Sequence, residues 1–180
     1  MEHGDHVMLL REGVEGAGKV WADLGSGKGA FTLALADILG PGAVIHSVER
    51  DERALNAQRA AMDARFPEVS VEYRQADFAG AVDLPPLDGV LMANSLHFVQ
   101  DKEPVLARVS RWLRPGGRLL IVEYDSDQGN NWAPHPVSYR TWEALAARTG
   151  FLETRLLRTI PSWFLGRIYS ALSVSGRAGG

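Results

Sequence analysis

Short runs rich in Val, Ile and Leu alternate with helical patterns along most of this chain. The runs cover residues 19–24, 43–48, 69–74, 87–93 and 118–124. Helical patterns lie between them at 30–39, 51–66 and 103–113. Short apolar runs are typical of parallel strands that are buried on both faces. Their repeated alternation with helices predicts an α/β fold, in which a doubly wound, mostly parallel sheet carries helices on both faces.

The C-terminal part of the chain departs from this alternation. After a helical pattern at 138–149, residues 152–160 and 167–174 both have strand character, and only six residues join them. A link that short permits only an antiparallel pair. We therefore expect seven strands, with the C-terminal strand antiparallel to the rest. At the other end, the helical spacing of apolar residues in 5–14 predicts a short lid helix near the carboxyl edge of the sheet.

Composition excludes several classes of protein. The chain has 180 residues and a formal charge of -3, which suits one ordinary globular domain. It contains no Cys, so thiol nucleophiles, disulfides and thiolate metal sites are excluded. No stretch approaches the roughly 18 apolar residues that span a bilayer, and the first residues lack the pattern of a secretory leader. We therefore expect a soluble, cytoplasmic protein with no membrane partner.

Two further ligand classes are disfavoured by the charged and His residues. The basic side chains form no dense run, which argues against nucleic acid as a partner. The five His residues share no metal-ligand spacing with acids, so no metal site is expected.

Three glycines, Gly25, Gly27 and Gly29, join the first predicted strand to the helix that follows it. In an open α/β sheet such a loop binds a nucleotide-like ligand, because glycines let the ligand approach the backbone and the helix N-terminus closely. The spacing differs from the G-x-G-x-x-G of dinucleotide loops. Asp23 would also place a carboxylate beside a pyrophosphate, so it suits a cationic ligand better.

The pattern D-x-G-x-G-x-G resembles the cofactor loop of class I S-adenosylmethionine-dependent methyltransferases, whose ligand carries an ammonium and a sulfonium group. The resemblance implies a Rossmann-like fold and S-adenosyl-L-methionine as cofactor. Lys28 departs from the family, because many members carry a small residue there. The cofactor-binding candidates in the loop are Asp23, Gly25, Ser26, Gly27 and Gly29.

Further motifs follow in the order that the resemblance predicts. An acid at the end of the second strand is expected to bind the ribose hydroxyls, and Glu49 lies 24 residues after the first glycine. Asp77, after the third strand, is expected to accept from the adenine amino group, with Phe78 as an apolar wall. The segment after the fourth strand resembles the active-site loop of the family. These motifs add the cofactor-binding candidates Glu49, Arg50, Asp77, Phe78 and Asn94.

Each motif also has a purely structural alternative. The glycine loop could be an ordinary tight turn, and Asp23 could cap a helix or a loop. Glu49 could cap the helix that follows it, and Asp77 could hold a turn. Trp132 and Trp142 could cover the edge of the sheet rather than build a pocket for an acceptor.

The acceptor is expected beyond the fourth and fifth strands, on the opposite side from the glycine loop. Asn94, His97, Tyr124 and Asp125 would face the methyl group there. His97 and Asp125 are the candidate catalytic residues, although a His at this place in the family often only packs. The loop at 126–139 would close over an aromatic or heterocyclic acceptor. It carries the candidate contact residues Trp132, His135 and Tyr139.

We therefore expect one methyltransferase domain over residues 1–180. It comprises a lid segment at 1–18, a cofactor-binding core at 19–124, and an acceptor-side loop, helix and strand pair at 125–180. The expected reaction is direct displacement onto a small-molecule acceptor, with a general base needed only if the nucleophile carries a proton. A non-catalytic S-adenosylmethionine-binding or accessory subunit and an NAD-dependent oxidoreductase stay open as alternatives, as does a homodimer.

Overall fold

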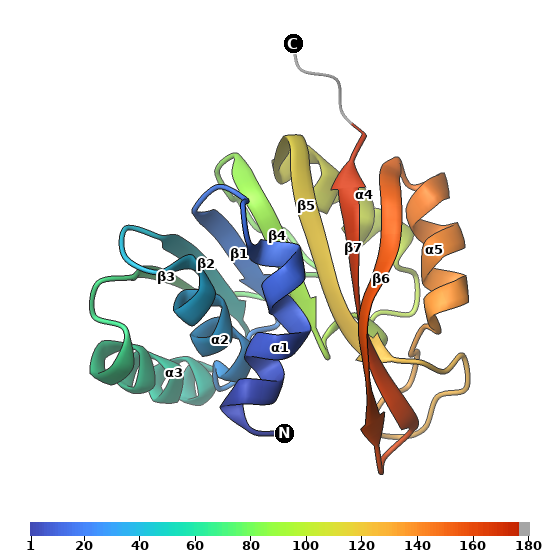
Figure 1. Ribbon diagram of the computed structural model, residues 1–180, viewed down its shortest axis with the longest axis horizontal. Coiled ribbons are helices and arrows are strands. Elements are labelled where there is room, and N and C mark those ends of the chain that lie inside the picture. Colours follow the sequence, from blue (N-terminus) through green and yellow to red (C-terminus); the bar gives the residue numbers. More distant parts are fainter. Residues whose placement is uncertain (177–180) are drawn as a thin grey trace.

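The computed structural model describes residues 1–176, so the last four positions of the expected domain lie outside the described residues. Helices and strands alternate along the chain as expected (Figure 1). The helices are α1 (His3–Val14), α2 (Ala30–Leu39), α3 (Glu52–Arg65), α4 (Glu103–Trp112) and α5 (Tyr139–Arg148), with a 3-10 turn, η1, at Leu96–Phe98. The strands are β1 (Val20–Leu24), β2 (Val44–Glu49), β3 (Ser70–Gln75), β4 (Leu87–Ala93), β5 (Leu113–Tyr124), β6 (Phe151–Ser162) and β7 (Gly166–Ser175).

The seven strands form one sheet in the order β3-β2-β1-β4-β5-β7-β6. Strands β1 to β5 pair in parallel, whereas β7 lies antiparallel between β5 and β6. The antiparallel C-terminal pair is therefore confirmed. The order reverses between β1 and β4, and in an open α/β sheet the ligand crevice lies at such a switch point, beyond the carboxyl ends of the strands.

Helices cover both faces of the sheet, and alternate strand residues enter two separate cores (Figure 1). In β4, Val90 and Met92 pack with α4 and α5, while Leu91 and Ala93 pack with α1 and α2. The period of two follows from the pleat of a strand. Both faces of the central strands are apolar for this reason, which is why the sequence shows continuous apolar runs there.

Helix α1 differs from the expected lid. Leu9 and Leu10 are completely buried, and a Cβ on Gly13 would lie only 2.7 Å from a methyl carbon of Leu120 in β5. The helix therefore packs on the sheet beside α2 as part of the core. Only Asp5 in its first turn and Met1, which precedes it, reach a hollow at the carboxyl edge.

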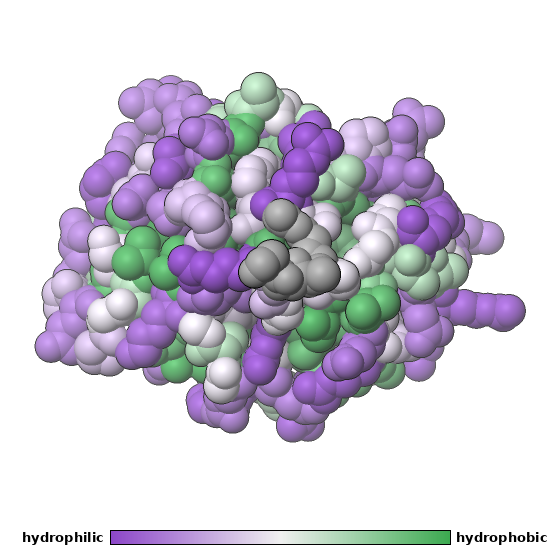
Figure 2. Space-filling model, turned by 90° about the horizontal axis from the view of Figure 1, so that it is seen from above, coloured by the Kyte–Doolittle hydropathy of each residue, from purple (hydrophilic) through white to green (hydrophobic). Residues whose placement is uncertain are grey.

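The two ends of the sheet differ in character. At the carboxyl edge of the parallel strands, the β6–β7 hairpin projects past the other strands (Figure 1). The opposite end, seen from above in Figure 2, presents mostly hydrophilic side chains with apolar ones scattered among them. None of the described helices is long and apolar enough to cross a membrane.

Candidate functional site

The glycine loop after β1 has a backbone that only glycine adopts easily. Gly25, Gly27 and Gly29 all have positive φ, at 77°, 54° and 86°. A Cβ on Gly25 would lie 2.6 Å from Cβ of Ser95 and 3.1 Å from Cε1 of Phe78. The loop therefore lies against the loops that follow β3 and β4, and a side chain at Gly25 would fill the gap between them.

Asp23, the last residue but one of β1, is a buried acid with 1% of its surface exposed. Burial raises its pKa from the usual 3.8 to about 7; a hydrogen bond from Thr32 opposes this rise, and the Glu49 carboxylate adds to it. The Thr32 hydroxyl donates to Oδ2 of Asp23 over 2.6 Å. A buried acid without a cationic partner of its own is suited to receive a cationic ligand group.

A buried polar network supports the loop from beneath. The hydroxyls of Ser26 and Ser47 lie 2.8 Å apart, and Ser47 donates to Oε1 of Gln58 over 2.8 Å. Gln58 in turn donates to the Thr32 hydroxyl that holds Asp23. Ser26 therefore shapes the loop rather than facing open space. Sequence reasoning missed Gln58, because a completely buried Gln on α3 looks like any other polar residue of a mostly hydrophilic helix.

Six of the predicted cofactor-binding residues line one hollow of about 200 Å³, called here the first hollow. They are Gly25, Glu49, Arg50, Asp77, Phe78 and Asn94. The other predicted loop residues, Asp23, Ser26, Gly27 and Gly29, do not line it, and Lys28, the departure from the family pattern, is exposed. The topology thus brings together residues that are up to 69 positions apart in the chain (25 to 94).

The two acids of the first hollow also serve the local backbone. Glu49 accepts from N of Gly27 over 2.9 Å and from N of Asp51 over 3.0 Å. Asp77 accepts from N of Ala79 over 2.8 Å, which closes a turn. The structural alternatives considered for both residues are therefore real, and they coexist with a position on the wall of the hollow.

Two buried polar atoms at the first hollow have no hydrogen-bond partner among the described residues. They are Oδ1 of Asn94 and Oγ of Ser95, and both residues line the hollow. Asn94 also holds a positive φ of 51°. Buried polar groups are nearly always hydrogen-bonded, so unpaired ones on a hollow point to a ligand with polar groups of its own.

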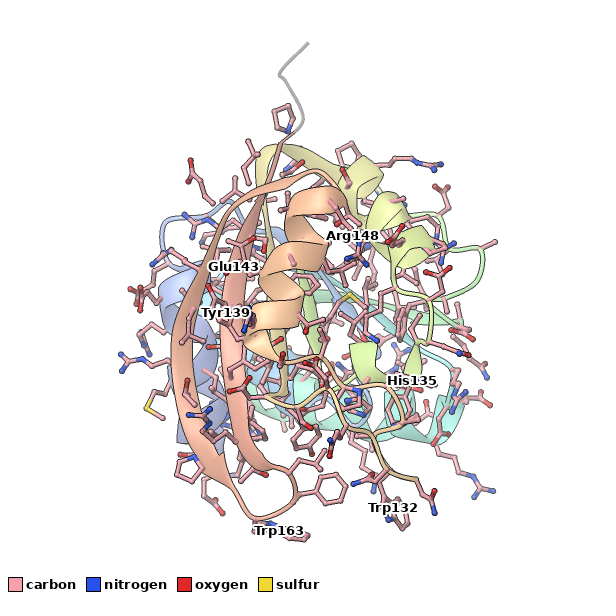
Figure 3. The ribbon with its side chains drawn as sticks, turned by 90° about the vertical axis from the view of Figure 1, so that its right-hand side faces the viewer. Trp132, His135, Tyr139, Glu143, Arg148 and Trp163 are labelled. Atoms are coloured by element: carbon pink, nitrogen blue, oxygen red, sulfur yellow. The ribbon has the colours of Figure 1, made fainter. Side chains whose placement is uncertain are left out.

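A second hollow, of about 690 Å³, lies at the same edge of the sheet, beyond β5 and the β6–β7 hairpin. His97 of η1 and Tyr124 at the end of β5 line it, together with Trp132 and the hairpin residues Trp163 and Phe164. Figure 3 shows Trp132 and Trp163 at one end of the molecule, with Trp163 at the tip of the β6–β7 hairpin. Aromatic side chains with few polar groups are typical of small-molecule sites.

His97 is fixed by a buried acid that sequence reasoning missed. Its Nδ1 lies 2.8 Å from Oε1 of Glu123, and its backbone N donates to Oε2 over 3.1 Å. Oε1 of Glu123 also accepts from N of Tyr124 over 2.9 Å. Glu123 is completely buried. The signal that could have revealed it is its place as the one acid in the otherwise apolar stretch 119–124.

Asp125, the other candidate catalytic residue, has both oxygens engaged. Oδ1 accepts from N of Tyr139 over 3.0 Å, and Oδ2 accepts from Arg167 of β7 over 2.9 Å. These bonds tie the start of α5 and the hairpin to the end of β5. The geometry gives Asp125 a structural role, and Glu123 rather than Asp125 is the acid that contacts His97.

The aromatic residues of the acceptor side divide between hollow and core. Trp132 lines the second hollow, whereas Trp142 is completely buried in the core with α5. Tyr139 donates to Glu143 one turn along its own helix over 3.2 Å. In Figure 3, Tyr139 lies at the first turn of α5, away from Trp132. The expectation that the whole loop builds the pocket therefore holds for Trp132 but not for Tyr139.

Comparisons with known proteins agree with this geometry. Residues 22–121 match a family described as "Methyltransferase domain". The ubiquinone/menaquinone biosynthesis C-methyltransferase UbiE of Saccharophagus degradans is 34% identical over 118 residues, which are 64% of this chain and 47% of that protein. The O-methyltransferase cnsE of Penicillium expansum is 32% identical over 109 residues, 58% of this chain and 38% of that protein. The chain spans about half the length of the UbiE proteins that it matches, or less.

Solved structures share the fold. The N-terminal domain of EvdMO1 with SAH bound has a TM-score of 0.74 at 22% identity, covering 97% of this chain and 82% of that one. A SAM dependent methyltransferase from Aquifex aeolicus has a TM-score of 0.73 at 18% identity, covering 94% and 89%. The family match spans more than half of the chain and includes the glycine loop and the segment after β4 that carries Asn94 and His97, whereas Glu123 lies two residues beyond its end. The chain therefore belongs to the methyltransferase domain family and has the Rossmann-like fold of S-adenosylmethionine-dependent methyltransferases.

Proposed function

We propose that this protein transfers the methyl group of S-adenosylmethionine to a small-molecule acceptor by direct displacement. The observation that carries the proposal is the joint position of the two hollows. Asn94, Ser95 and Phe98 line the first hollow, and His97, between them in the chain, lines the second. One short segment after β4 therefore separates the place for a methyl donor from the place for an acceptor.

The residues at the first hollow fit the cofactor. Its unpaired polar atoms on Asn94 and Ser95 and the acids Glu49 and Asp77 offer partners for the amino and hydroxyl groups of such a ligand. The buried acid Asp23 does not line the hollow but lies two residues before Gly25, which does. When bound, S-adenosylmethionine supplies a methyl group already activated by a sulfonium. The protein then has to align the acceptor and exclude water, which lowers the barrier without a covalent intermediate.

The second hollow favours an enzyme over a non-catalytic binding module. A module that only holds the cofactor needs the first hollow and nothing beyond it. Here an aromatic hollow with an oriented His97 lies next to it. The names of the relatives, which include C- and O-methyltransferases, support a small-molecule acceptor as well. The cytoplasmic location, the homodimer and the absence of a metal stay predictions from the sequence.

Calorimetry with S-adenosylhomocysteine and a radiolabelled methyl-transfer assay on cell extract test the proposal together. We expect the cofactor to bind and to raise the melting temperature, because a ligand of the native state stabilises it, whereas NAD does not. Glu49→Ala removes charge-assisted bonds worth roughly 1.5 to 3 kcal/mol, so binding weakens at least about tenfold. Glu68→Ala, which removes an exposed acid elsewhere, is the matched control. Cofactor binding without any labelled product would instead support the non-catalytic module.

A further inference from the structure

Glu123 is held in a geometry that serves His97. The carboxylate is completely buried and accepts three N–H groups, two from His97 and one from the backbone of Tyr124. Because both oxygens are held by backbone N–H groups, the carboxylate has a fixed orientation. His97 is itself only 4% exposed and packs beside the ring of Tyr124, with 5.7 Å between the ring centroids.

This contact determines which nitrogen of His97 carries the proton. An ionised carboxylate is an acceptor only, so Nδ1 of His97 must donate to Glu123 across the 2.8 Å contact. In the neutral ring Nε2 is then unprotonated and carries a lone pair. Nε2 has no hydrogen-bond partner in residues 1–176, and His97 lines the second hollow. The ring therefore presents a basic nitrogen to whatever binds there.

We propose that His97 is a general base and that Glu123 is its positioning residue, acting on an acceptor that carries a hydroxyl group on a flat aromatic ring. The proposal rests on the proposed function. As the hydroxyl oxygen forms its bond to the methyl carbon, the carbon–sulfur bond breaks and its electron pair goes to sulfur. The hydroxyl proton goes to Nε2 of His97, and the resulting imidazolium is stabilised by Glu123 and later loses that proton to water.

The lining of the second hollow specifies the acceptor class. Tyr124, Trp132, Trp163 and Phe164 provide flat apolar surface, and Ile160 and Ile168 add aliphatic surface. Among its described lining residues the one acidic or basic side chain besides His97 is Asp5, and there is no Lys or Arg; the amino group of Met1 is the one cation. An anionic acceptor would find no cationic side chain on these walls. A neutral hydroxyl is therefore favoured, and a neutral hydroxyl is the form that needs a base before it attacks.

Two probe acceptors of different acidity test this role. We would measure methyl transfer to 1-naphthol, which is neutral at pH 7, and to 4-nitro-1-naphthol, which is already ionised. For 1-naphthol, His97→Ala should lower kcat by about 10²- to 10⁴-fold, the range for general acid–base catalysis. For the ionised probe the loss should shrink to a few fold, because no proton has to be removed. A merely structural His97 would give equal losses with both probes and would overturn the proposal.

Glu123→Gln separates positioning from folding. It keeps the shape of the side chain but removes the charge, so transfer to 1-naphthol should fall at least tenfold with little change in KM. His46→Ala is the matched control, since His46 is also buried and lies 3.2 Å from an acid, Glu72, but on β2 away from both hollows. It should lower thermal stability and leave the ratio of the two naphthol rates unchanged.

The tautomer of His97 can be measured on the wild-type protein, without a variant or an acceptor. A long-range ¹H–¹⁵N spectrum of histidine-labelled protein should show His97 protonated on Nδ1 and bare on Nε2; the opposite tautomer would overturn the proposal. Failure of 1-naphthol and 4-nitro-1-naphthol alike to accept methyl from a protein that binds S-adenosylhomocysteine would overturn the acceptor class. Failure to bind S-adenosylhomocysteine at all would instead overturn the proposed function.

Discussion

Asp23 is a single carboxyl group whose protonation should control cofactor affinity near neutral pH. Burial raises its pKa to about 7, so about one tenth of the groups are ionised at pH 6 and about nine tenths at pH 8. The ionised form favours a cationic ligand group. We therefore expect affinity for S-adenosylhomocysteine to rise up to about tenfold from pH 6 to pH 8. Calorimetry at both pH values measures this, and Asp23→Asn should bind weakly with no such pH dependence.

The same burial means that ionised Asp23 should lower the free energy of unfolding of the protein when no ligand is bound. Its folded-state pKa lies above the unfolded value of 3.8, so the free energy of unfolding falls as pH rises from about 4 to about 7. The full penalty above pH 7 is of the order of 4 kcal/mol. Asp23→Asn keeps an oxygen that accepts from Thr32 and removes the charge. Denaturant unfolding should show this variant to be more stable than the wild type at pH 8, with a smaller gain at pH 5; equal gains would contradict the assignment.

Gly25 is expected to be indispensable for the cofactor for a reason that backbone strain alone does not provide. Gly42 also has a positive φ, of 78°, but no atom lies within 4 Å of where its Cβ would be. Gly25→Ala and Gly42→Ala should each cost about 1 to 2 kcal/mol of stability for the left-handed backbone. Only Gly25→Ala should lose binding of S-adenosylhomocysteine, because its methyl group meets Ser95 and Phe78. Thermal shift with and without ligand distinguishes the two effects.

At the scale of elements, Asp125 joins three parts of the acceptor side. It connects the end of β5 with the first residue of α5 and with Arg167 of β7. Asp125→Ala removes bonds worth roughly 2 kcal/mol. Hydrogen exchange should then accelerate at 126–139 and in the first turn of α5, while the glycine loop stays protected. Asp83→Ala, on an exposed loop elsewhere, should leave this exchange unchanged. Unchanged hydrogen exchange in Asp125→Ala would show that these two hydrogen bonds do not stabilise the acceptor side.

The C-terminal hairpin shows where strand patterns lose their regularity. Register shifts between β6 and β7 occur at Leu152/Arg155 and at Leu156/Arg158, and Glu153 has a positive φ of 51°. Each such bulge moves the following side chains to the other face, which explains the imperfect alternation in this part of the sequence. The antiparallel direction was still predictable, because it depends on the length of the link and not on the alternation.

Over the whole molecule, the elements of the fold were predictable wherever neighbouring residues in the sequence determine them. Strand and helix bounds agree within about two residues for the central elements, because apolar runs and glycine or proline breaks mark them. Strand β5 is the exception: it begins at Leu113, five residues before the predicted run, and passes through Pro115 and Gly116 beside a register shift with β4. The turn residues there suggested a loop, and only the pairing of Leu113 with Leu87 makes the segment part of the sheet.

In the candidate site, only the residues that belong to sequence motifs were predictable. Residues that face the first hollow belong to loops at fixed places in the strand order, so Glu49, Asp77 and Asn94 could be named from the sequence. Glu123 and Gln58 act through partners 26 positions away along the chain, His97 and Thr32. Such pairings arise from tertiary packing, and no local pattern marks them. Tyr124 and Trp132, named from the sequence for the acceptor side, line the second hollow, but the contribution of Trp163 and Phe164 depends on how far the hairpin projects.

The projecting hairpin also affects the intrinsic tryptophan fluorescence expected of this protein. Trp21 and Trp142 are completely buried, whereas Trp163 and Trp132 are 97% and 76% exposed, and both of these exposed indoles line the second hollow. Long-wavelength emission, which comes from hydrated indoles, therefore originates mainly at the acceptor side of the molecule. Quenchers in solution reach those two rings but do not reach the buried rings of Trp21 and Trp142. The fifth indole, Trp112 at the end of α4, is partly buried, so the signal that quenchers remove reports mainly on the region where an acceptor would arrive.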